Sequence, residues 1–389
     1  MRGFRLLVLG QAASEFGNAF QAVALPMLVY SLGGGTGQLS AVVSAFGIGR
    51  LAAAPLGGIC ADRWGARRVM LAADLGRLAA TAALAVAALR HLDDLLLIGT
   101  LTCLVGLGAG LFLPASWAVV PDLLPADDLQ AGNALSSTVN HTAGLLGPPL
   151  AGAVLLWLDP GTGLVVDAAT FAVSALTLLL IGRTGERTRE DPGADRATGF
   201  LALLRGSRML RGLLAVTVVT NLTVGGMTRI GLPALATGDF AAGAVGFGAL
   251  LAAFTGGCLL GGPIAAALDG VRHRGRTAGL AALLMGLAVA LVPFAGLPGA
   301  LVALLVAGVA CTVNNVLLIT GVQHRTPPAL LARVMAALTF CALCAFPLSA
   351  LAVGAVVTAF GTPGVFVVTG LTMLAATGIT FTVREVREM

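Results

Sequence analysis

Long apolar stretches alternate with short polar or Gly- and Pro-rich breaks along this 389-residue chain. Most stretches reach about 20 residues, the length that an α-helix needs to cross the hydrocarbon core of a bilayer. A membrane β-barrel would instead show short segments of alternating polarity. The pattern predicts twelve membrane-spanning helices, over residues 5–32, 38–61, 69–90, 95–120, 131–157, 162–182, 210–236, 243–268, 277–296, 299–322, 331–358 and 362–383.

The composition agrees with an all-α membrane protein. Hydrophobic residues make up 57% of the chain and charged residues 11%, whereas about a quarter of the residues of a soluble domain are charged. The 53 glycines suit helices whose backbones approach closely inside a bilayer. All six cysteines lie within apolar stretches without the spacing of a zinc site, so we expect packing residues, no metal and no cofactor.

The arginines decide the expected orientation. Almost all of them fall in the breaks on one side of the predicted spans, and short basic loops stay in the cytoplasm. We therefore expect a multi-pass protein of the bacterial cytoplasmic membrane with both termini in the cytoplasm. This topology accounts for the net charge of +5 without a nucleic-acid partner.

The only long polar segment lies in the middle of the chain and contains "RTGERTREDPGADRATG", residues 183–199. It divides the chain into an N-terminal bundle of six helices (1–182), a cytoplasmic central loop (183–209) and a C-terminal bundle of six helices (210–389). Weak sequence echoes relate the halves: Gly58 and Asp62 follow the second span as Gly262 and Asp269 follow the eighth. Two pseudo-symmetric bundles are an arrangement that can rock about a central site.

The segment Gly58-x-x-x-Asp62-Arg63-x-Gly65-x-Arg67-Arg68 resembles the signature loop of the major facilitator superfamily. It requires a tight turn at Gly65, close helix approach at Gly58, and charges that hold the two bundles together in one state and release them in the other. The family usually has another basic residue where this chain has Ala66. The residues expected to form this conformational latch are Gly58, Asp62, Arg63, Gly65, Arg67, Arg68, Asp74, Arg77 and Asp122.

A second resemblance lies in the fifth span. The stretch Ala143-x-x-x-Gly147-Pro148-x-x-Ala151-Gly152 is similar to the antiporter motif of the same superfamily, with alanine replacing glycine at two places. Gly147, Pro148 and Gly152 would bend this span and let a neighbour pack against it. An ordinary proline kink is the alternative. The phrases "LAADLGR" (71–77) and "LVVDAATF" (164–171) are similar to the macrolide-efflux and siderophore-export branch.

Ionisable residues deep inside a span usually face an interior cavity because their burial is costly. Glu15 and Arg50 each lie about 15 Å from the cytoplasmic side by helical rise, so they can pair. We expect Glu15, Arg50 and Asp167 to couple transport to protons, although a static ion pair remains an alternative. The residues expected to line the substrate cavity are Gln11, Asn18, Asn140, His141, Asn221, Arg229, Asn314 and Asn315.

These features predict a secondary active transporter, not an enzyme: a monomeric, proton-coupled antiporter that exports small amphipathic molecules by alternating access. Its partners are then a small-molecule substrate, protons and the lipid bilayer. Proton-coupled uptake by symport is the alternative within transport. A polytopic membrane enzyme is less favoured, because Asp93-Asp94 and Asp127-Asp128 lack further acids at helical spacing and fall on opposite sides of the membrane.

Overall fold

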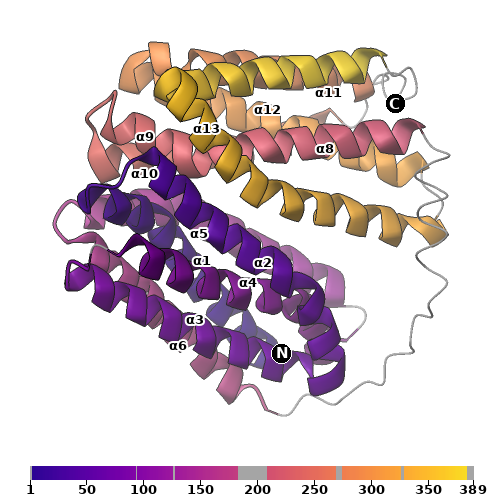
Figure 1. The fold of residues 1–389 in the computed structure, drawn as a ribbon. Coiled ribbons are helices and arrows are strands. Elements are labelled where there is room, and N and C mark those ends of the chain that lie inside the picture. The colour runs from indigo at the N-terminus through magenta and orange to yellow at the C-terminus, as the bar shows by residue number, and fades with distance from the viewer. Residues whose placement is uncertain are drawn as a thin grey trace. The chain divides into compact units, whose positions relative to one another are not determined.

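The computed structural model describes residues 2–92, 94–125, 128–182, 208–268, 274–325 and 328–382. Every regular element within these ranges is helical, as the sequence pattern predicts (Figure 1). Eight of the helices are long and apolar enough to cross a membrane. The elements are α1 (Arg2–Ser31), α2 (Thr36–Trp64), α3 (Ala66–Leu89), α4 (Leu95–Leu123), α5 (Leu129–Val154), α6 (Pro160–Leu180), α8 (Arg208–Gly226), η2 (Met227–Gly231), α9 (Leu232–Thr237), α10 (Gly243–Ala267), α11 (Arg274–Leu291), η3 (Val292–Phe294), α12 (Gly296–Arg325) and α13 (Pro328–Thr382).

Local sequence signals explain several helix ends. Gly65 separates α2 from α3 with φ 87°, a left-handed conformation that favours glycine. Asp94 is the N-cap of α4, and its Oδ1 accepts hydrogen bonds from the backbone N–H groups of Leu96 (2.9 Å) and Leu97 (3.1 Å). Gly361, with φ 71° and ψ 178°, interrupts α13, which covers both of the last two predicted spans.

A π-helical turn, η2, interrupts the seventh predicted span. Pro233 follows it and has no N–H group to donate to the carbonyl of residue 229. The N–H of Leu232 instead donates to the carbonyl oxygen of Met227, five residues earlier. The wider turn thus accommodates a proline that would otherwise disrupt the α-helix.

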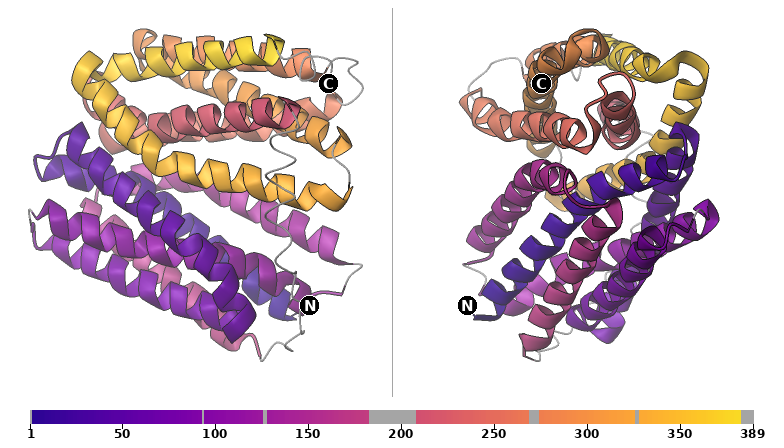
Figure 2. Two further views of the ribbon diagram at one scale, coloured as in Figure 1. Left: turned by 45° about the vertical axis from the view of Figure 1, so that its right-hand side comes forward. Right: turned by 90° about the vertical axis from the view of Figure 1, so that its left-hand side faces the viewer.

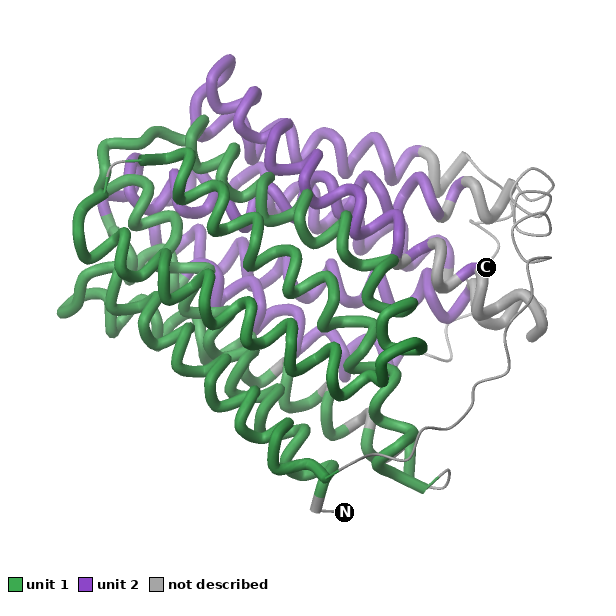
Figure 3. Tube along the Cα trace, turned by 60° about the horizontal axis from the view of Figure 1, so that its bottom comes forward, with its two compact units in different colours: residues 1–189, 242–249 green, residues 190–241, 250–389 purple. Residues whose placement is uncertain are grey.

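The chain forms two compact units, residues 1–189 with 242–249 and residues 190–241 with 250–389 (Figure 3). Helices α1–α6 fall in the first unit, together with residues 243–249 of α10. The rest of α10, with α8, α9 and α11–α13, falls in the second. Residues 183–207 of the predicted central loop lie outside the described residues. Within each unit, the long helices run side by side (Figure 2).

Glycines bring α2 and α4 into close contact in the first unit. A Cβ atom on Gly106 would collide with the carbonyl oxygen of Phe46, and one on Gly110 would collide with that of Arg50. A Cβ atom on Gly49 would likewise collide with the carbonyl oxygen of Cys103. The absence of side chains at these positions lets two backbones touch, which is how membrane helices pack without a hydrophobic driving force between them.

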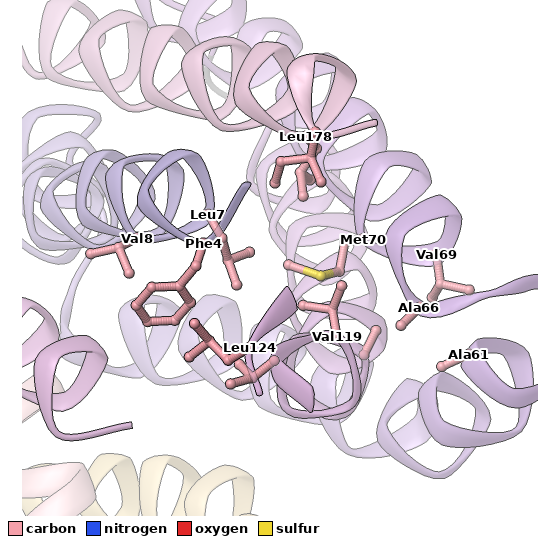
Figure 4. Close-up of a cluster of buried hydrophobic side chains, with 13 residues drawn as sticks. Phe4, Leu7, Val8, Ala61, Ala66, Val69, Met70, Val119, Leu124 and Leu178 are labelled. Atoms are coloured by element: carbon pink, nitrogen blue, oxygen red, sulfur yellow. The ribbon is translucent and has the colours of Figure 1, made fainter. Parts of the chain in front are cut away.

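Each unit also has its own apolar cluster. In the first unit, side chains from α1, α2, α3, α4 and α6 meet around Phe4, Leu7, Met70, Val119 and Leu178 (Figure 4). A second cluster gathers side chains of α8, α10, α11, α12 and α13. Its buried members are Val216, Ala265, Ala278, Val313, Leu317, Leu318, Val334 and Leu338.

Candidate functional site

A buried arginine lies at the centre of the polar interior of the first unit. Arg77 on α3 is only 3% exposed, and the carbon atom of its guanidinium group lies 3.9 Å from the centre of the Phe171 ring on α6. A second ring, that of Phe112 on α4, lies 5.7 Å away. Such cation–π contacts stabilise a guanidinium group that is removed from water.

Polar groups from α1 complete the surroundings of this guanidinium group. Its Nη2 donates a 2.6 Å hydrogen bond to Oδ1 of Asn18, and Nη1 lies 3.5 Å from the hydroxyl oxygen of Ser14. Arg77 therefore joins α3 to α1 through hydrogen bonds and to α6 and α4 through aromatic contacts.

Asp74, one helical turn before Arg77, is the acid that pairs with it. Its Oδ1 lies 3.5 Å from Nη1 of Arg77, and its Oδ2 accepts a 2.6 Å hydrogen bond from the hydroxyl of Ser174 on α6. From the sequence, Asp74 and Arg77 are expected to support the cytoplasmic latch. Both side chains lie in the interior of the first unit, against α1 and α6.

Asp167 on α6 is a second fully buried acid near Arg77, with which it interacts electrostatically. Neither carboxylate oxygen has a hydrogen-bond partner among the described residues. The carboxylate lies against Gly17 of α1, where an added Cβ would come within 2.6 Å of Oδ1. Glycine at position 17 therefore provides the room that this acid occupies.

Glu15 and Arg50 act on the same cluster from α1 and α2. Arg50 interacts electrostatically with both Glu15 and Arg77. Within the described residues, however, Glu15 and Arg50 do not form the direct ion pair that their depths suggested. Glu15 is instead exposed and faces an open cavity.

This cavity has a volume of about 360 Å³ and lies between α1, α4 and α5. It brings together three residues that were predicted from sequence: Gln11, Glu15 and Asn140. Ser14 and Phe112 also line it, so the cavity directly adjoins the groups that surround Arg77. The remaining lining residues are Leu113, Ser116, Trp117, Val120 and Ser136.

A second cavity of about 230 Å³ lies within the second unit, between α8, α12 and α13. It brings together Asn221, Asn314 and Asn315, which the sequence predicted as cavity-lining groups. Thr217, Thr220 and Cys311 add further polar atoms, and apolar side chains complete the wall. Each unit thus has a partly polar cavity of its own.

Two other predicted cavity residues lie elsewhere. Arg229 is an exposed residue in the π-helical turn η2 and does not line either cavity. Asn18 contacts Arg77 rather than a cavity. The side chain of His141 lies outside the described residues.

The turn after α2 has the predicted glycine geometry at Gly65, but the expectation of close helix approach at Gly58 is wrong for the described residues. A Cβ on Gly58 would meet no atom within 4 Å, whereas one on Gly57 would come within 2.6 Å of Pro114 and 2.7 Å of the Leu111 carbonyl oxygen. The close contact with α4 therefore falls one residue earlier, on the side of α2 that faces α4.

The charged residues of this turn have different environments. Arg67 donates hydrogen bonds to the carbonyl oxygens of Leu178 and Leu179 at the end of α6. Asp62, Arg63 and Arg68 are exposed. Asp122, in the last turn of α4, is partly buried. Arg67 thus has a packing contact inside the first unit.

In α5, the glycines of the predicted antiporter segment make the close contacts expected of small residues. Gly147 packs on Ala19 of α1. A Cβ on Gly152 would come within 2.7 Å of the carbonyl oxygen of Ala244, in the part of α10 that belongs to the first unit. Pro148, which follows Gly147, is also buried, and its carbonyl oxygen lies against Gly248 of α10.

Sequence reasoning missed Phe171 and Ser174 as site residues. Both contact the Asp74–Arg77 pair, and they follow Asp167 by four and seven positions on α6. That spacing places the three side chains on one face of a helix. A search for polar and aromatic residues on the same face as Asp167 would have found them.

The comparisons with known proteins agree with this architecture. Residues 7–232 match the family model of the Major Facilitator Superfamily, and the chain belongs to this family of membrane transporters. It is a multi-pass membrane protein that transports small molecules.

Three relatives show how far the similarity extends. The "Uncharacterized MFS-type transporter y4rN" of Sinorhizobium fredii is 30% identical over 289 residues, which cover 71% of this chain and 69% of the relative. The "Multidrug efflux pump Tap" of Mycobacterium tuberculosis is 26% identical over 99% of this chain and 94% of the pump. For the "Uncharacterized MFS-type transporter YfiS" of Bacillus subtilis, 22% identical, the match spans 56% of this chain and about half of the relative (53%).

Among solved structures, the nucleoside transporter NupG has the same fold. Its TM-score is 0.81 over 98% of this chain and 99% of that chain, with 13% sequence identity. At this identity the likeness shows the fold alone.

Proposed function

We propose that this chain is a proton-coupled exporter of small amphipathic molecules that works by alternating access. The observation that carries the proposal is the direct contact between a cavity and a buried cluster of charges in the first unit. Ser14 and Phe112 line the cavity and also contact Arg77. Because ionisable groups inside a membrane protein are costly, such a cluster next to an open cavity is typical of a proton-coupled transport pathway.

The efflux direction is supported by the relatives. A multidrug efflux pump aligns with this chain over nearly its whole length, at 26% identity. The contacts of Gly147 and Gly152 also fit the antiporter segment that the sequence indicated. Proton-coupled uptake is the alternative, and direction is part of the test below.

The cavities support an amphipathic substrate. The first cavity combines a carboxylate and polar amides with the rings of Phe112 and Trp117. The second combines three asparagines with aliphatic side chains. Ligand sites with a largely apolar wall and a few polar groups bind molecules that have both kinds of surface.

We assign twelve membrane spans to this transporter. Helices α1–α6 are the first six, the continuous run α8–η2–α9 is the seventh, and α10, α11 and α12 follow. The two parts of α13 on either side of Gly361 are the last two. With the arginine-rich breaks in the cytoplasm, both termini and residues 183–209 lie on the cytoplasmic side, and the exporter acts as a monomer.

The proposal is tested in proteoliposomes that contain the purified full-length protein. Uptake and release of ethidium, a lipophilic cation, and of a panel of neutral antibiotics and siderophores are measured with an imposed pH gradient of either direction. We expect substrate movement against its gradient when protons flow the opposite way. Substrate movement in the same direction as protons would show a symporter, and movement that ignores the pH gradient would contradict proton coupling.

The carboxyl groups expected to couple transport to protons are those of Glu15, which faces the cavity, and Asp167. Replacement of the coupling carboxyl group by its amide should abolish proton-driven accumulation, while substrate exchange without net proton movement persists. Asp159→Asn, at an exposed acid before α6, is the matched control and should leave both activities unchanged. Unchanged driven transport in Glu15→Gln would show that the proton uses another carboxyl group.

A further inference from the structure

Two buried acids share one buried guanidinium group in the first unit. Arg77 interacts electrostatically with both Asp74 and Asp167, and all three side chains are at most 3% exposed. Arg50 interacts with Glu15, which lies at the cavity. When both aspartates are ionised, one negative charge beside Arg77 is in excess. An uncompensated charge inside a membrane protein is costly, so one carboxyl group is expected to hold a proton.

The contacts distinguish the three acids. Asp74 has both a guanidinium partner and a hydroxyl donor, which stabilise its carboxylate form. Glu15 is exposed to the cavity, where water can solvate its charge. Asp167 has zero exposure and no hydrogen-bond donor among the described residues. Of the three carboxyl groups, Asp167 is therefore the one whose charge is least compensated.

We propose that Asp167 holds the single exchangeable proton of the first unit, and that Arg77 is the counter-ion that Asp167 shares with Asp74. This assignment rests on the proposed proton-coupled function and deepens it. It places the coupling proton on α6, inside the bundle, instead of on the cavity-lining Glu15. Arg77 is the charged group that interacts with Asp167 among the described residues. Asp74 from α3, Glu15 from α1 and Arg50 from α2 interact with Arg77 in turn.

The chemical step is a simple proton transfer. The neutral carboxyl group of Asp167 releases its proton to water in the cavity and becomes a carboxylate. Arg77 then faces two carboxylates with one positive charge, and its attraction is divided between Asp74 and Asp167. Ser14 on α1 contacts Arg77 and also lines the cavity, so the surroundings of Arg77 adjoin the space that holds this water.

This arrangement links charge to helix packing. Arg77 is held by Asn18 on α1, by the ring of Phe171 on α6 and by Asp74 on its own helix. A shift of the guanidinium group towards Asp167 strains its 2.6 Å hydrogen bond to Asn18 and changes its position over the ring. Loss of the proton therefore changes the contacts of Arg77 with α1, α3 and α6 together.

The first test identifies the protonated group without transport. Infrared difference spectra of the purified full-length protein in vesicles, recorded from acid to alkaline pH, report the carbonyl band of a protonated carboxylic acid. We expect one such band from a buried acid, lost as the pH rises, in the wild type and in Asp74→Asn, Glu15→Gln and Asp159→Asn. Asp167→Asn should lack it. A wild type without this band, or a band that persists in Asp167→Asn, would overturn the assignment.

The second test uses thermal stability in detergent. Asparagine has nearly the shape of a neutral aspartic acid, so Asp167→Asn should unfold within a degree or two of the wild type. Asp74→Asn removes the partner of a buried guanidinium group and should lower the unfolding temperature clearly, by about 4 °C or more. Equal destabilisation by both substitutions would mean that Asp167 is ionised in this state and would contradict the proposal.

The third test separates the proposal from the function on which it rests. Ethidium efflux driven by a pH gradient is measured in the same vesicles for the wild type, Asp167→Asn and Asp159→Asn. We expect Asp167→Asn alone to lower the rate of proton-driven ethidium efflux, by at least tenfold. If the wild type itself shows no proton-driven transport, the proposed function fails while the infrared assignment stands or falls separately. Driven transport at the wild-type rate in Asp167→Asn would overturn the assignment alone.

Discussion

Arg67 at the start of α3 binds the end of α6: its Nε donates a 2.7 Å hydrogen bond to the carbonyl oxygen of Leu178, and its Nη2 donates a 3.1 Å bond to that of Leu179. The last carbonyl groups of a helix have no partner within the helix, and a cation near them also interacts favourably with the helix dipole. One side chain therefore satisfies two carbonyl groups at the C-terminal end of α6.

This contact predicts that Arg67→Gln destabilises the protein by about 1–3 kcal/mol, the range for hydrogen bonds to a charged group. The neighbouring Arg68 is exposed, so Arg68→Gln should change stability by less than about 0.5 kcal/mol. Reversible unfolding in mixed detergent micelles, followed by circular dichroism, measures both. Equal stability of the two variants would show that the bonds to α6 contribute little.

The contact between α2 and α4 predicts a second pair of variants. Gly106→Ala places a methyl group against the Phe46 carbonyl, and the helices must separate, at a cost of about 1–3 kcal/mol. On the same helix, a Cβ on Gly99 would meet nothing within 4 Å. Gly99→Ala should therefore be neutral or stabilise the protein by up to about 1 kcal/mol, because alanine favours the helix. The same unfolding assay decides, and a tolerated Gly106→Ala would mean that the helices adjust easily.

The contact of Arg77 with Phe171 predicts an energetic contribution beyond burial. Phe171 and Phe366 are both fully buried, but only the first is shown with a cation over its ring among the described residues. Phe171→Leu should cost about 2 kcal/mol more than Phe366→Leu, the value of a cation–π contact removed from water. In the background of Arg77→Met, this difference should disappear. If it persists, packing and not the cation accounts for it.

The proposed latch gives a fourth prediction. Asp62 is exposed near the end of α2, and Asp62→Asn keeps the size of this side chain while it removes the charge. Transport in proteoliposomes should nevertheless fall at least tenfold, because the substitution removes a charge that is expected to hold one conformational state. Asp159→Asn serves again as the control. Wild-type transport by Asp62→Asn across the range of pH gradients would contradict the latch.

Much of the architecture could be predicted from sequence because the bilayer imposes one strong requirement, an apolar segment of sufficient length. The turn at Gly65 could also be predicted, since a glycine between charged residues at a break indicates a left-handed conformation. The position of close packing could not, because Gly57 and Gly58 are equivalent in sequence and only the direction of α2 relative to α4 decides which one touches its neighbour.

The polar interior shows the same limit. Depth along each helix placed Glu15 and Arg50 at the same level, but pairing also depends on the rotation of each helix. That rotation directs the side chain of Glu15 towards a cavity, and it brings Arg77, not Arg50, into contact with an aspartate. Four helices, α1, α3, α4 and α6, meet at Arg77. Residue spacing within one segment cannot predict which helices will meet.

The π-helical turn at Met227–Gly231 alters how the seventh span can be compared with any other helix. A π-turn takes in one residue more than an α-turn, and each residue of an α-helix corresponds to a rotation of about 100°. Positions after Gly231 are therefore out of phase with positions before Met227. A cysteine scan of this span should show the periodicity of accessible positions shift by one residue across Met227–Gly231.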